Sequence, residues 1–336
     1  MLPTHEVRQY LRDNEDRTGT GEEAGSMSTE TGTYRLITRP DFDGVVCGAL
    51  FMEQDMIDAV MFAHPRDMQH GQIEVSGNDI TTNLPYVSGV HLCFDHHVSE
   101  SERIGPMENH VIDPKAPSAA RVVFDHYGGK KAFPLVDPAL IDAVDKADSA
   151  AFNEEEILAP DGYTMLNFIL DGRTGLSRLR DFAISEEQLM IDMMTYCRHH
   201  PVDEILQIPD VAERVRTYIL NEEFAELQIK RCAEVNDNVV TVDLRGEDTL
   251  YTVNRFLVYA LYPKCNISIH LTNLADKGRV EIAVGKSILD RSNKVNIGSL
   301  LLQYGGGGHA AVGTCQVAPD DADRIAREIL TAVRGE

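Results

Sequence analysis

The stretch YRLITRPDFDGVVCGALFMEQDMIDAVMFA, residues 34–63, decides the fold. Its first five residues, Tyr34 to Thr38, read as a strand, and the apolar spacing of Val45 to Met56 indicates the helix that follows. Ala59 to Ala63 reads as a second strand. A strand, a helix and another strand in this order are typical of a parallel sheet covered by helices.

The same alternation continues beyond this stretch. Val90 to Phe94 reads as another short strand, and helices are expected at Ser118 to Tyr127 and at Pro138 to Ala147. We therefore predict an α/β fold in which helices cover both faces of a parallel, Rossmann-like sheet. Ligands of such sheets bind beyond the carboxyl ends of the strands.

The chain of 336 residues is longer than a typical single domain, and we predict four segments. They are a flexible leader at 1–32, a parallel-sheet domain at 33–184, a helical linker at 185–236 and a smaller mixed α/β domain at 237–336. Within the leader, His5 to Asp16 has the pattern of a short helix. In the last domain, strands are expected at 239–244, 266–271 and 279–284, and helices at 296–304 and 320–333.

Composition limits the partners. The formal net charge of -23 leaves no general basic face for a long duplex, although local cations can still bind a small anion. No apolar stretch reaches the roughly 18 residues of a membrane span. The six cysteines are scattered without paired spacing, which favours free thiols and a cytoplasmic protein.

Two motifs combine carboxylates with imidazoles. Asp41-Phe42-Asp43-Gly44 follows the first strand, and Asp95-His96-His97 follows the strand at Val90 to Phe94. Both should lie at the same edge of the sheet, where their side chains suit Mn²⁺ and, less well, Mg²⁺. Each motif has a structural alternative, because Asp43 is a normal helix cap and a strand-end His is often a surface or core residue.

Three further acidic residues are candidates for the same cluster. Asp79, in Gly77-Asn78-Asp79-Ile80, is expected to end an intermediate strand, although a turn is the alternative. Asp145 or Asp148 is expected to complete the cluster from a helix C-terminus. A carboxylate is unfavourable there unless a cation compensates it, and a solvated helix face is the alternative.

A glycine run near the C-terminus suggests an anion cradle. Gly305 to Gly308 precede His309, and glycines let backbone N–H groups converge on an anion. Arg291 is among the nearby cations. A floppy loop is the alternative reading of the glycines.

Taken in this order, the two acidic motifs and the Gly-Gly-Gly-Gly-His run resemble the DHH/DHHA1 phosphoesterases, from about Tyr34 to the C-terminus. The combination is specific, whereas each piece alone is weak. The resemblance implies an N-terminal DHH catalytic domain and a C-terminal DHHA1 substrate-binding domain.

The resemblance also implies roles for individual residues. The implied metal ligands are Asp41, Asp43, Asp79, His96 and Asp148, with Asp145 as a close rival of Asp148. Asp79 would bridge two metals. The implied catalytic residues are Asp95 and His97. The implied substrate contacts are Arg291, Gly305, Gly306, Gly307, Gly308 and His309.

The implied function is hydrolysis of short oligonucleotides, as by a nanoRNase, or of 3′-phosphoadenosine 5′-phosphate. We expect two Mn²⁺ ions per chain, with Mg²⁺ as the alternative, since paired ions activate water and stabilise an in-line displacement. The substrate would lie between the two domains, and a homodimer is expected. An exopolyphosphatase and a catalytically weak nucleotide-binding regulator are the alternatives. The second arises because Ile37 stands where many members of the family have a His.

Overall fold

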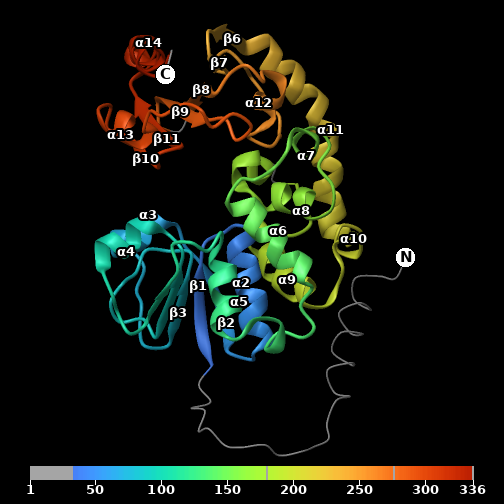
Figure 1. The fold of residues 1–336 in the computed structure, drawn as a ribbon. Helices are drawn as coiled ribbons and strands as arrows, with labels where there is room; N and C mark the ends of the chain where they lie inside the picture. The colour runs from blue at the N-terminus through green and yellow to red at the C-terminus, as the bar shows by residue number, and fades with distance from the viewer. Residues whose placement is uncertain (1–32, 179–180, 275–276, 335–336) are drawn as a thin grey trace, which may run out of the picture. The chain divides into compact units, whose positions relative to one another are not determined.

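The structure, a computed structural model, describes residues 33–178, 181–274 and 277–334 (Figure 1). The leader expected at 1–32, with its helix at His5 to Asp16, lies outside the described residues. Within the described ranges, no helix is both long enough and apolar enough to cross a membrane.

The first sheet has five parallel strands in the order β2-β1-β3-β4-β5. The strands are β1 (Tyr34–Thr38), β2 (Ile57–Phe62), β3 (Asp79–Thr82), β4 (Leu92–Asp95) and β5 (His110–Ile112). The chain passes from β1 to β2 on one side and then returns to add β3 on the other. The order therefore reverses between β1 and β3, and ligands of open α/β sheets bind at such a point.

Helices cover both faces of this sheet, as the sequence predicts. They are α2 (Phe42–Glu53), α3 (Pro65–Gln69), α4 (Val98–Ile104), α5 (Ala119–His126) and α6 (Pro138–Asp148). Figure 1 shows α2 and α5 on one side of the sheet and α3 and α4 on the other. Leu36 packs into the large core with α2, whereas its neighbour Ile37 packs with Met68 of α3. Ile37 is thus a core residue of the second face.

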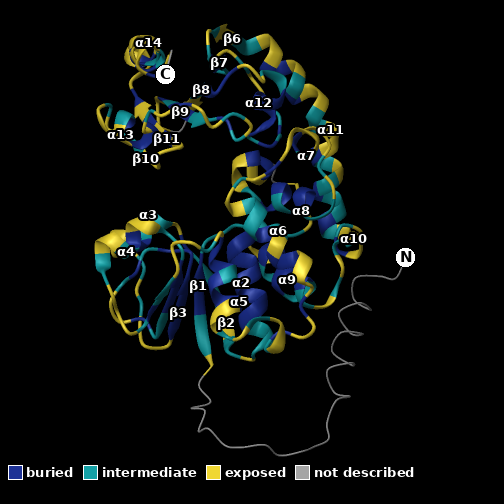
Figure 2. Cartoon of the chain, viewed as in Figure 1, coloured by how far each residue is buried: buried dark blue, intermediate teal, exposed yellow. Residues whose placement is uncertain are grey.

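A helical segment follows, and it begins before the linker predicted at 185–236. Its helices are α7 (Glu154–Leu158), α8 (Gly162–Leu170), α9 (Glu186–His199), α10 (Val202–Ile205) and α11 (Pro209–Cys232). Short 3₁₀ helices lie at η1 (Gly129–Lys131), η2 (Gly172–Thr174) and η3 (Leu176–Arg178). Figure 2 shows α2 buried along most of its length, and α9 packs against it. The large core includes Phe168 of α8 and Met193 of α9.

The second sheet is mixed, with six strands in the order β10-β11-β9-β8-β7-β6. The strands are β6 (Ala233–Asn236), β7 (Val239–Asp243), β8 (Ile267–Leu274), β9 (Arg279–Lys286), β10 (Gly307–Gly308) and β11 (Val312–Val317), and the helices are α12 (Leu257–Leu261), α13 (Ile297–Leu302) and α14 (Pro319–Val333). Ile267, Ile269 and Leu271 share a second core with residues of α13 and α14. The residues that alternate with these along β8 point to the opposite face of the sheet, which is polar.

The six cysteines are unpaired in the part of the chain that the structure describes. Five are buried, and Cys232 at the end of α11 is partly exposed. Burial raises the pKa of Cys197 to about 12. These thiols therefore behave as small apolar side chains.

Candidate metal centre and cavity

Asp41 caps α2. Its Oδ1 accepts a hydrogen bond from the backbone nitrogen of Gly44 at 3.0 Å, and its Oδ2 lies 2.9 Å from Arg39 Nε. Because the cap is Asp41, α2 begins at Phe42, three residues before the predicted start. Gly44 is needed for close approach, since a Cβ there would overlap the carbonyl oxygen of Arg39.

Asp43 lies in the first turn of α2 and points into the protein. Its two carboxylate oxygens accept hydrogen bonds from the backbone nitrogens of Ala119 and Ala120, at 3.0 and 2.7 Å. The start of α5 therefore fixes this carboxylate. Burial, and then the negative charges of Asp148 and Asp41, raise the pKa of Asp43 above its ordinary range.

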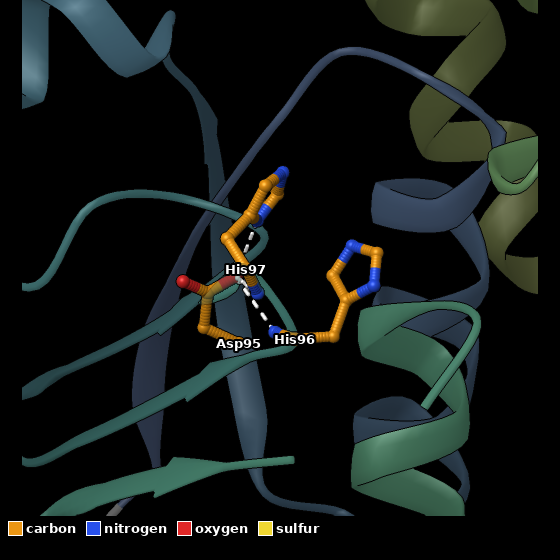
Figure 3. Close-up of side chains that lie close together, drawn as sticks. All are labelled: Asp95, His96 and His97. Atoms are coloured by element: carbon orange, nitrogen blue, oxygen red, sulfur yellow. Dashed lines mark hydrogen bonds and ion pairs between the residues drawn. The ribbon is translucent and has the colours of Figure 1, made fainter. Parts of the chain in front are cut away.

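Asp95 ends β4 and orients His97 (Figure 3). Its Oδ1 accepts hydrogen bonds from the backbone nitrogen of His96 at 2.8 Å and from the His97 ring at Nδ1, 2.7 Å away. His97 Nδ1 therefore carries the proton, and its Nε2 keeps a lone pair. Asp95 Oδ2 is buried and has no hydrogen-bond partner among the described residues.

His96 presents its Nε2 to Asp148. Its Nδ1 lies 3.2 Å from the carbonyl oxygen of Ala116, which fixes the proton on Nδ1. Nε2 lies 3.1 Å from Asp148 Oδ2, but the contact lacks hydrogen-bond geometry, and no other described residue is a partner of Nε2. Burial alone would lower the pKa of His96, but Asp148 outweighs it and raises that pKa.

Asp43, His96 and Asp148, which we call the metal cluster, each offer a ligand atom, and these atoms lie within 4.8 Å of one another. Without a cation, the raised pKa values of Asp43 and His96 favour protons on these two groups, which reduce the repulsion within the cluster. A divalent cation would replace those protons, because metal ligands bind in their deprotonated forms. Carboxylate oxygens with an imidazole nitrogen are a donor set that fits a divalent transition metal such as Mn²⁺.

The structure does not bring Asp79 into this cluster. Asp79 begins β3 and pairs in register with Arg35 at the start of β1, so it lies at the amino edge of the sheet. Arg35 Nε and the backbone nitrogen of Ser76 donate to its carboxylate at 2.7 and 2.6 Å. Burial acts to raise its pKa, but these hydrogen bonds hold the pKa below its usual value. The expectation that Asp79 ends a strand is wrong.

Asp145 also lies outside the metal cluster. Its carboxylate accepts hydrogen bonds from Ser118 Oγ at 2.7 Å and from Arg121 Nε at 2.8 Å. Of the two rivals, Asp148 is therefore the residue that reaches His96. Asp145 and Asp148 are three positions apart on α6, so they lie on the same side of the helix and sequence spacing does not distinguish them.

Asn83 is a buried polar residue near Asp95 that the sequence analysis did not single out. It follows β3 directly, and its backbone nitrogen donates to the carbonyl oxygen of Phe94, the residue before Asp95. Its φ of 54° lies in the left-handed region, where strain is common at functional sites. The side chain is 1% exposed, and neither amide atom has a partner within the described ranges. The signal available in the sequence was a polar residue after Ile80 to Thr82.

A cavity of about 810 Å³ opens beside the metal cluster. Asp43 of α2, Asp148 of α6 and His97 line it from the N-terminal half, and His309 lines it from the C-terminal half. The His97 and His309 rings are stacked, with centroids 6.2 Å apart. Ser268 and His270, from the polar face of the second sheet, also line the cavity.

The glycine run has a different place from the predicted cradle. Among the described residues that line the cavity, His309 is present but Gly305, Gly306, Gly307 and Gly308 are not. A Cβ at Gly306 or Gly308 would overlap the backbone of β11, at Thr314 or Val312. The glycines therefore let β10 lie close against β11, which positions His309 next to the site.

Arginines gather on the cavity wall. Arg291, a predicted contact, lines the cavity and donates from Nη2 to the carbonyl oxygens of Ser149 and Ala150, at 3.2 and 2.9 Å. Arg39, Arg173 and Arg255 also line it, and the sequence reading missed all three. They come from distant parts of the sequence, with Arg173 in η2, so no local pattern in the sequence joins them.

Comparison with solved structures shows a strong similarity. A solved structure described as a pGpG-specific phosphodiesterase, PggH from Vibrio cholerae, is 50% identical, with a TM-score of 0.80. The alignment covers 90% of this chain and 99% of that one. No protein-family model matches the chain, and no curated protein does.

Two more distant structures also match. CDC45 from Entamoeba histolytica is 8% identical, with a TM-score of 0.49, over 96% of this chain and 97% of that one. RecJ from Thermus thermophilus, in complex with Mn²⁺, is 12% identical, with a TM-score of 0.49, over 90% of this chain and 52% of that one.

Proposed function

The chain belongs to the DHH family of phosphoesterases, and from that premise we propose that it hydrolyses the phosphodiester bond of pGpG or a similarly short oligonucleotide. The observation that carries the proposal is the 50% identity to a pGpG-specific phosphodiesterase over 90% of the chain. At that identity and coverage, both the fold and the enzyme class, a hydrolase of phosphate esters, are common to the two proteins.

The size and charge of the site support a short substrate. The cavity of about 810 Å³ lies within the range of roughly 300–1,000 Å³ for small-molecule sites. A net charge of -23 disfavours long nucleic acids, which need an extended basic surface. A dinucleotide needs only the local arginines of the cavity.

We propose that the metal cluster holds Mn²⁺, with Mg²⁺ as the alternative. A bound ion of this kind polarises a phosphoryl oxygen and makes water nucleophilic at neutral pH. Asp43 and His96 are fixed by backbone contacts, so the ligands are oriented before the ion binds. The second Mn²⁺ stays a prediction. Asp41, Asp95 Oδ2 and the Asn83 amide are the oxygen donors that remain for it.

His97 is proposed as the residue that moves a proton. Asp95 holds its Nδ1–H, which orients the ring and leaves Nε2 free at the cavity. Once Nε2 has taken up a proton from solvent, the imidazolium can give that proton to the leaving oxygen of the phosphodiester. Arg39, held by Asp41, is placed to neutralise charge that develops on the phosphoryl oxygens.

The test is an assay of the full chain with Mn²⁺ on a panel of substrates. The panel holds pGpG, its adenine analogue, a trinucleotide, 3′-phosphoadenosine 5′-phosphate and polyphosphate, with nucleotide and inorganic phosphate products both measured. We expect GMP from pGpG with the highest kcat/KM of the panel. Phosphate release from polyphosphate without GMP from pGpG would contradict the proposal.

A matched pair of variants on α6 links the assay to the site. Asp148→Asn removes a proposed ligand, and we expect it to lower kcat by at least about 100-fold. Asp142→Asn removes a carboxylate from the same helix, but Asp142 is exposed and pairs with Arg121. The Asp142 variant should keep wild-type activity. Equal effects of the two substitutions would remove Asp148 from the metal site.

We also propose a homodimer that uses the outer face of α11. Leu220, Phe224 and Leu227 are spaced at one face of this helix, and all are more than half exposed. A second copy of the same helix presents a complementary apolar strip around a twofold axis. Light scattering of the wild type and of Leu220→Glu/Leu227→Glu tests this. A monomeric wild type contradicts it.

The cytoplasmic location also stays a proposal. It is supported by the six unpaired thiols in the described part of the chain, which suit a reducing compartment. Fractionation of cells that make the protein checks it.

A further inference from the structure

Two arginines, Arg173 and Arg255, share one carboxylate in the cavity wall. Asp171 Oδ1 accepts hydrogen bonds from the backbone nitrogen of Arg173 at 3.0 Å and from its Nε at 2.6 Å. Arg255 Nε is 3.7 Å from Asp171 Oδ2, too far for a hydrogen bond. This Nε is buried and has no hydrogen-bond partner among the described residues. Asp171 is therefore hydrogen-bonded to Arg173 and leaves the Nε donor of Arg255 unsatisfied.

Aromatic packing holds Arg255 in place. Its guanidinium lies 4.4 Å from the centroid of the Phe256 ring. Phe256 in turn packs against Phe152 and Phe168, with ring centroids 5.8 and 6.3 Å apart. All three rings belong to the large core. The position of Arg255 therefore does not depend on a ligand.

Both guanidiniums stay charged at neutral pH. Burial, and then the charge of Arg173, lower the pKa of Arg255 to about 10. For Arg173, burial acts to lower the pKa, but Asp171 outweighs it and raises the pKa. An anion beside Arg255 would relieve the repulsion between the two cations and satisfy the unpaired donor.

Arg214 shows how this chain satisfies an arginine that has only a structural role. Its side chain donates to the carbonyl oxygens of Asp210 and Ile184, at 2.9 and 2.7 Å. Its guanidinium also lies over an aromatic ring, that of Phe182. Arg255 has the same aromatic support but lacks the carbonyl partners. A structural role alone therefore leaves its buried donor unexplained.

We propose that Arg255 and Arg173 form a second anion subsite, which binds the terminal phosphate of a dinucleotide whose phosphodiester lies at the metal cluster. This inference rests on the proposed function and names the substrate feature that the site selects. Guanidinium groups bind phosphate oxygens through paired N–H donors. Both arginines line the same cavity as Asp43 and Asp148 of the metal cluster, so one dinucleotide can contact both sites.

The subsite makes the 5′-terminal phosphate a condition for tight binding. In pGpG, one phosphate is the bond to be cleaved and the other is free to bind Arg255. GpG has the same cleavable bond but lacks the second phosphate. The enzyme should therefore prefer pGpG to GpG, and the preference should lie mainly in KM.

The experiment compares kcat/KM for pGpG and for GpG in the full chain with Mn²⁺. A lost charge-assisted contact corresponds to a preference of about 10- to 100-fold for pGpG in the wild type. In Arg255→Gln the ratio should fall toward one. Arg255→Lys keeps the positive charge but lacks the paired N–H donors of a guanidinium, so it should give an intermediate ratio. Arg279→Gln, a control outside the cavity on β9, should keep the wild-type ratio.

The outcomes separate the subsite from the proposed function. If the wild type cleaves pGpG and GpG with equal kcat/KM, the subsite is overturned and the proposed function stands. If it cleaves neither, the proposed function fails and the subsite fails with it. A preference that persists in a folded Arg255→Gln overturns the assignment of Arg255. Should that variant not fold, the ratio in Arg173→Gln decides in the same way.

Discussion

At the scale of single residues, the site gathers carboxylate oxygens and an imidazole nitrogen that can all serve as metal ligands. Asp43 and Asp148 each present carboxylate oxygens, and His96 presents the lone pair of Nε2. Asp95 Oδ2, buried beside them, also lacks a partner among the described residues. Such an arrangement is costly for the protein alone and favourable with a cation bound.

Asp79 offers the sharpest contrast at this scale. We expect Asp79→Asn to lower the free energy of unfolding by about 2 kcal/mol, because Arg35 and Ser76 lose a charged acceptor. Its affinity for Mn²⁺ should match that of the wild type. Urea unfolding measures the first effect and calorimetric titration the second. A loss of Mn²⁺ binding without a loss of stability would return Asp79 to the metal site.

Asn83 gives a second residue-scale prediction. Its amide is buried with no partner in the described ranges, next to the strand that ends in Asp95. Asn83→Leu, which keeps the size and removes the amide, should weaken Mn²⁺ binding by about 10-fold. Asn83→Asp should strengthen it, since a carboxylate adds charge to the site. Paramagnetic resonance of Mn²⁺ reads out both variants without activity. Unchanged affinity in both would exclude Asn83 from the metal site.

The sequence predicted that Asp43 and His96 lie near each other, because the parallel sheet brings the carboxyl ends of β1 and β4 to one edge. The roles of Asp41, Asp43, His96 and His97 stay predictions. Asp79 was misplaced because β3 is short, so a shift of four residues moves a side chain from one edge to the other. Asn83 was missed because a neutral amide does not stand out beside carboxylates.

At the scale of elements, β10 shows how glycines shape the site indirectly. Gly306 and Gly308 allow the chain to lie against β11, and that contact fixes where His309 stands. Their lack of side chains serves backbone packing. The glycine run is visible in the sequence, but its role in strand packing is not. An anion cradle and a close contact between strands both need glycine, so the sequence does not distinguish them.

Gly306→Ala tests this reading of β10. The new Cβ would overlap the carbonyl oxygen of Thr314. We expect the free energy of unfolding to fall by about 1–3 kcal/mol, the usual cost of overpacking. Gly246→Ala is the matched control, since none of the described residues lies within 4 Å of a Cβ there. It should stay within about 0.5 kcal/mol of the wild type. Equal melting curves for the two variants would contradict the close contact.

The polar face of β8 contributes a dependence of stability on pH. Burial lowers the pKa of His270 to about 4, below its ordinary value of 6.5. Between these two values the unfolded chain binds a proton that the folded chain does not, so stability falls as the pH is lowered through this window. The expected loss by pH 4 is about 1–3 kcal/mol, reduced because the cavity admits water to the ring.

His270→Gln checks that prediction, because the variant has no ring to protonate. Its free energy of unfolding should fall less steeply than that of the wild type between pH 6.5 and pH 4. Urea unfolding at several pH values without metal gives the two slopes. Parallel slopes would mean that His270 does not contribute.

At the scale of the whole molecule, the large core does not stop at the boundaries predicted from the sequence. It includes Leu36 of the first sheet, Phe168 of α8 and Phe256 next to α12, which lies beyond residue 236. Asn254 Nδ2 also donates to the carbonyl oxygen of Ile157 at 3.1 Å. The residues proposed to bind the metal and those proposed to bind the substrate are therefore connected through one packed interior.

This continuity predicts that residues 33–236 do not fold well alone. A fragment of residues 33–236 lacks Phe256, so the rings of Phe152 and Phe168 that pack on it become exposed. We expect the fragment to bind the dye ANS and to lose the cooperative urea transition of the full chain. A sharp transition without dye binding would show that the first half is independent.

The sequence predicts the α/β class, the parallel sheet and the helical linker because each has a strong periodic pattern. It does not predict that Arg39, Arg173 and Arg255 line one cavity, since these arginines are far apart in the sequence. Nor does it predict the shared core. Leu36 and Ile37 are adjacent and apolar, which indicates that both faces of β1 are buried. This pattern does not indicate which elements cover each face.

The unpaired thiols allow the native protein to be labelled with a fluorophore at a cysteine. Burial raises the pKa of Cys93 and Cys197 to about 12, so an alkylating reagent finds little thiolate there. Cys232, at the junction of α11 and β6, is the more accessible position. A maleimide fluorophore added to the native enzyme should therefore attach at that junction first, which provides a spectroscopic reporter between the two halves of the chain.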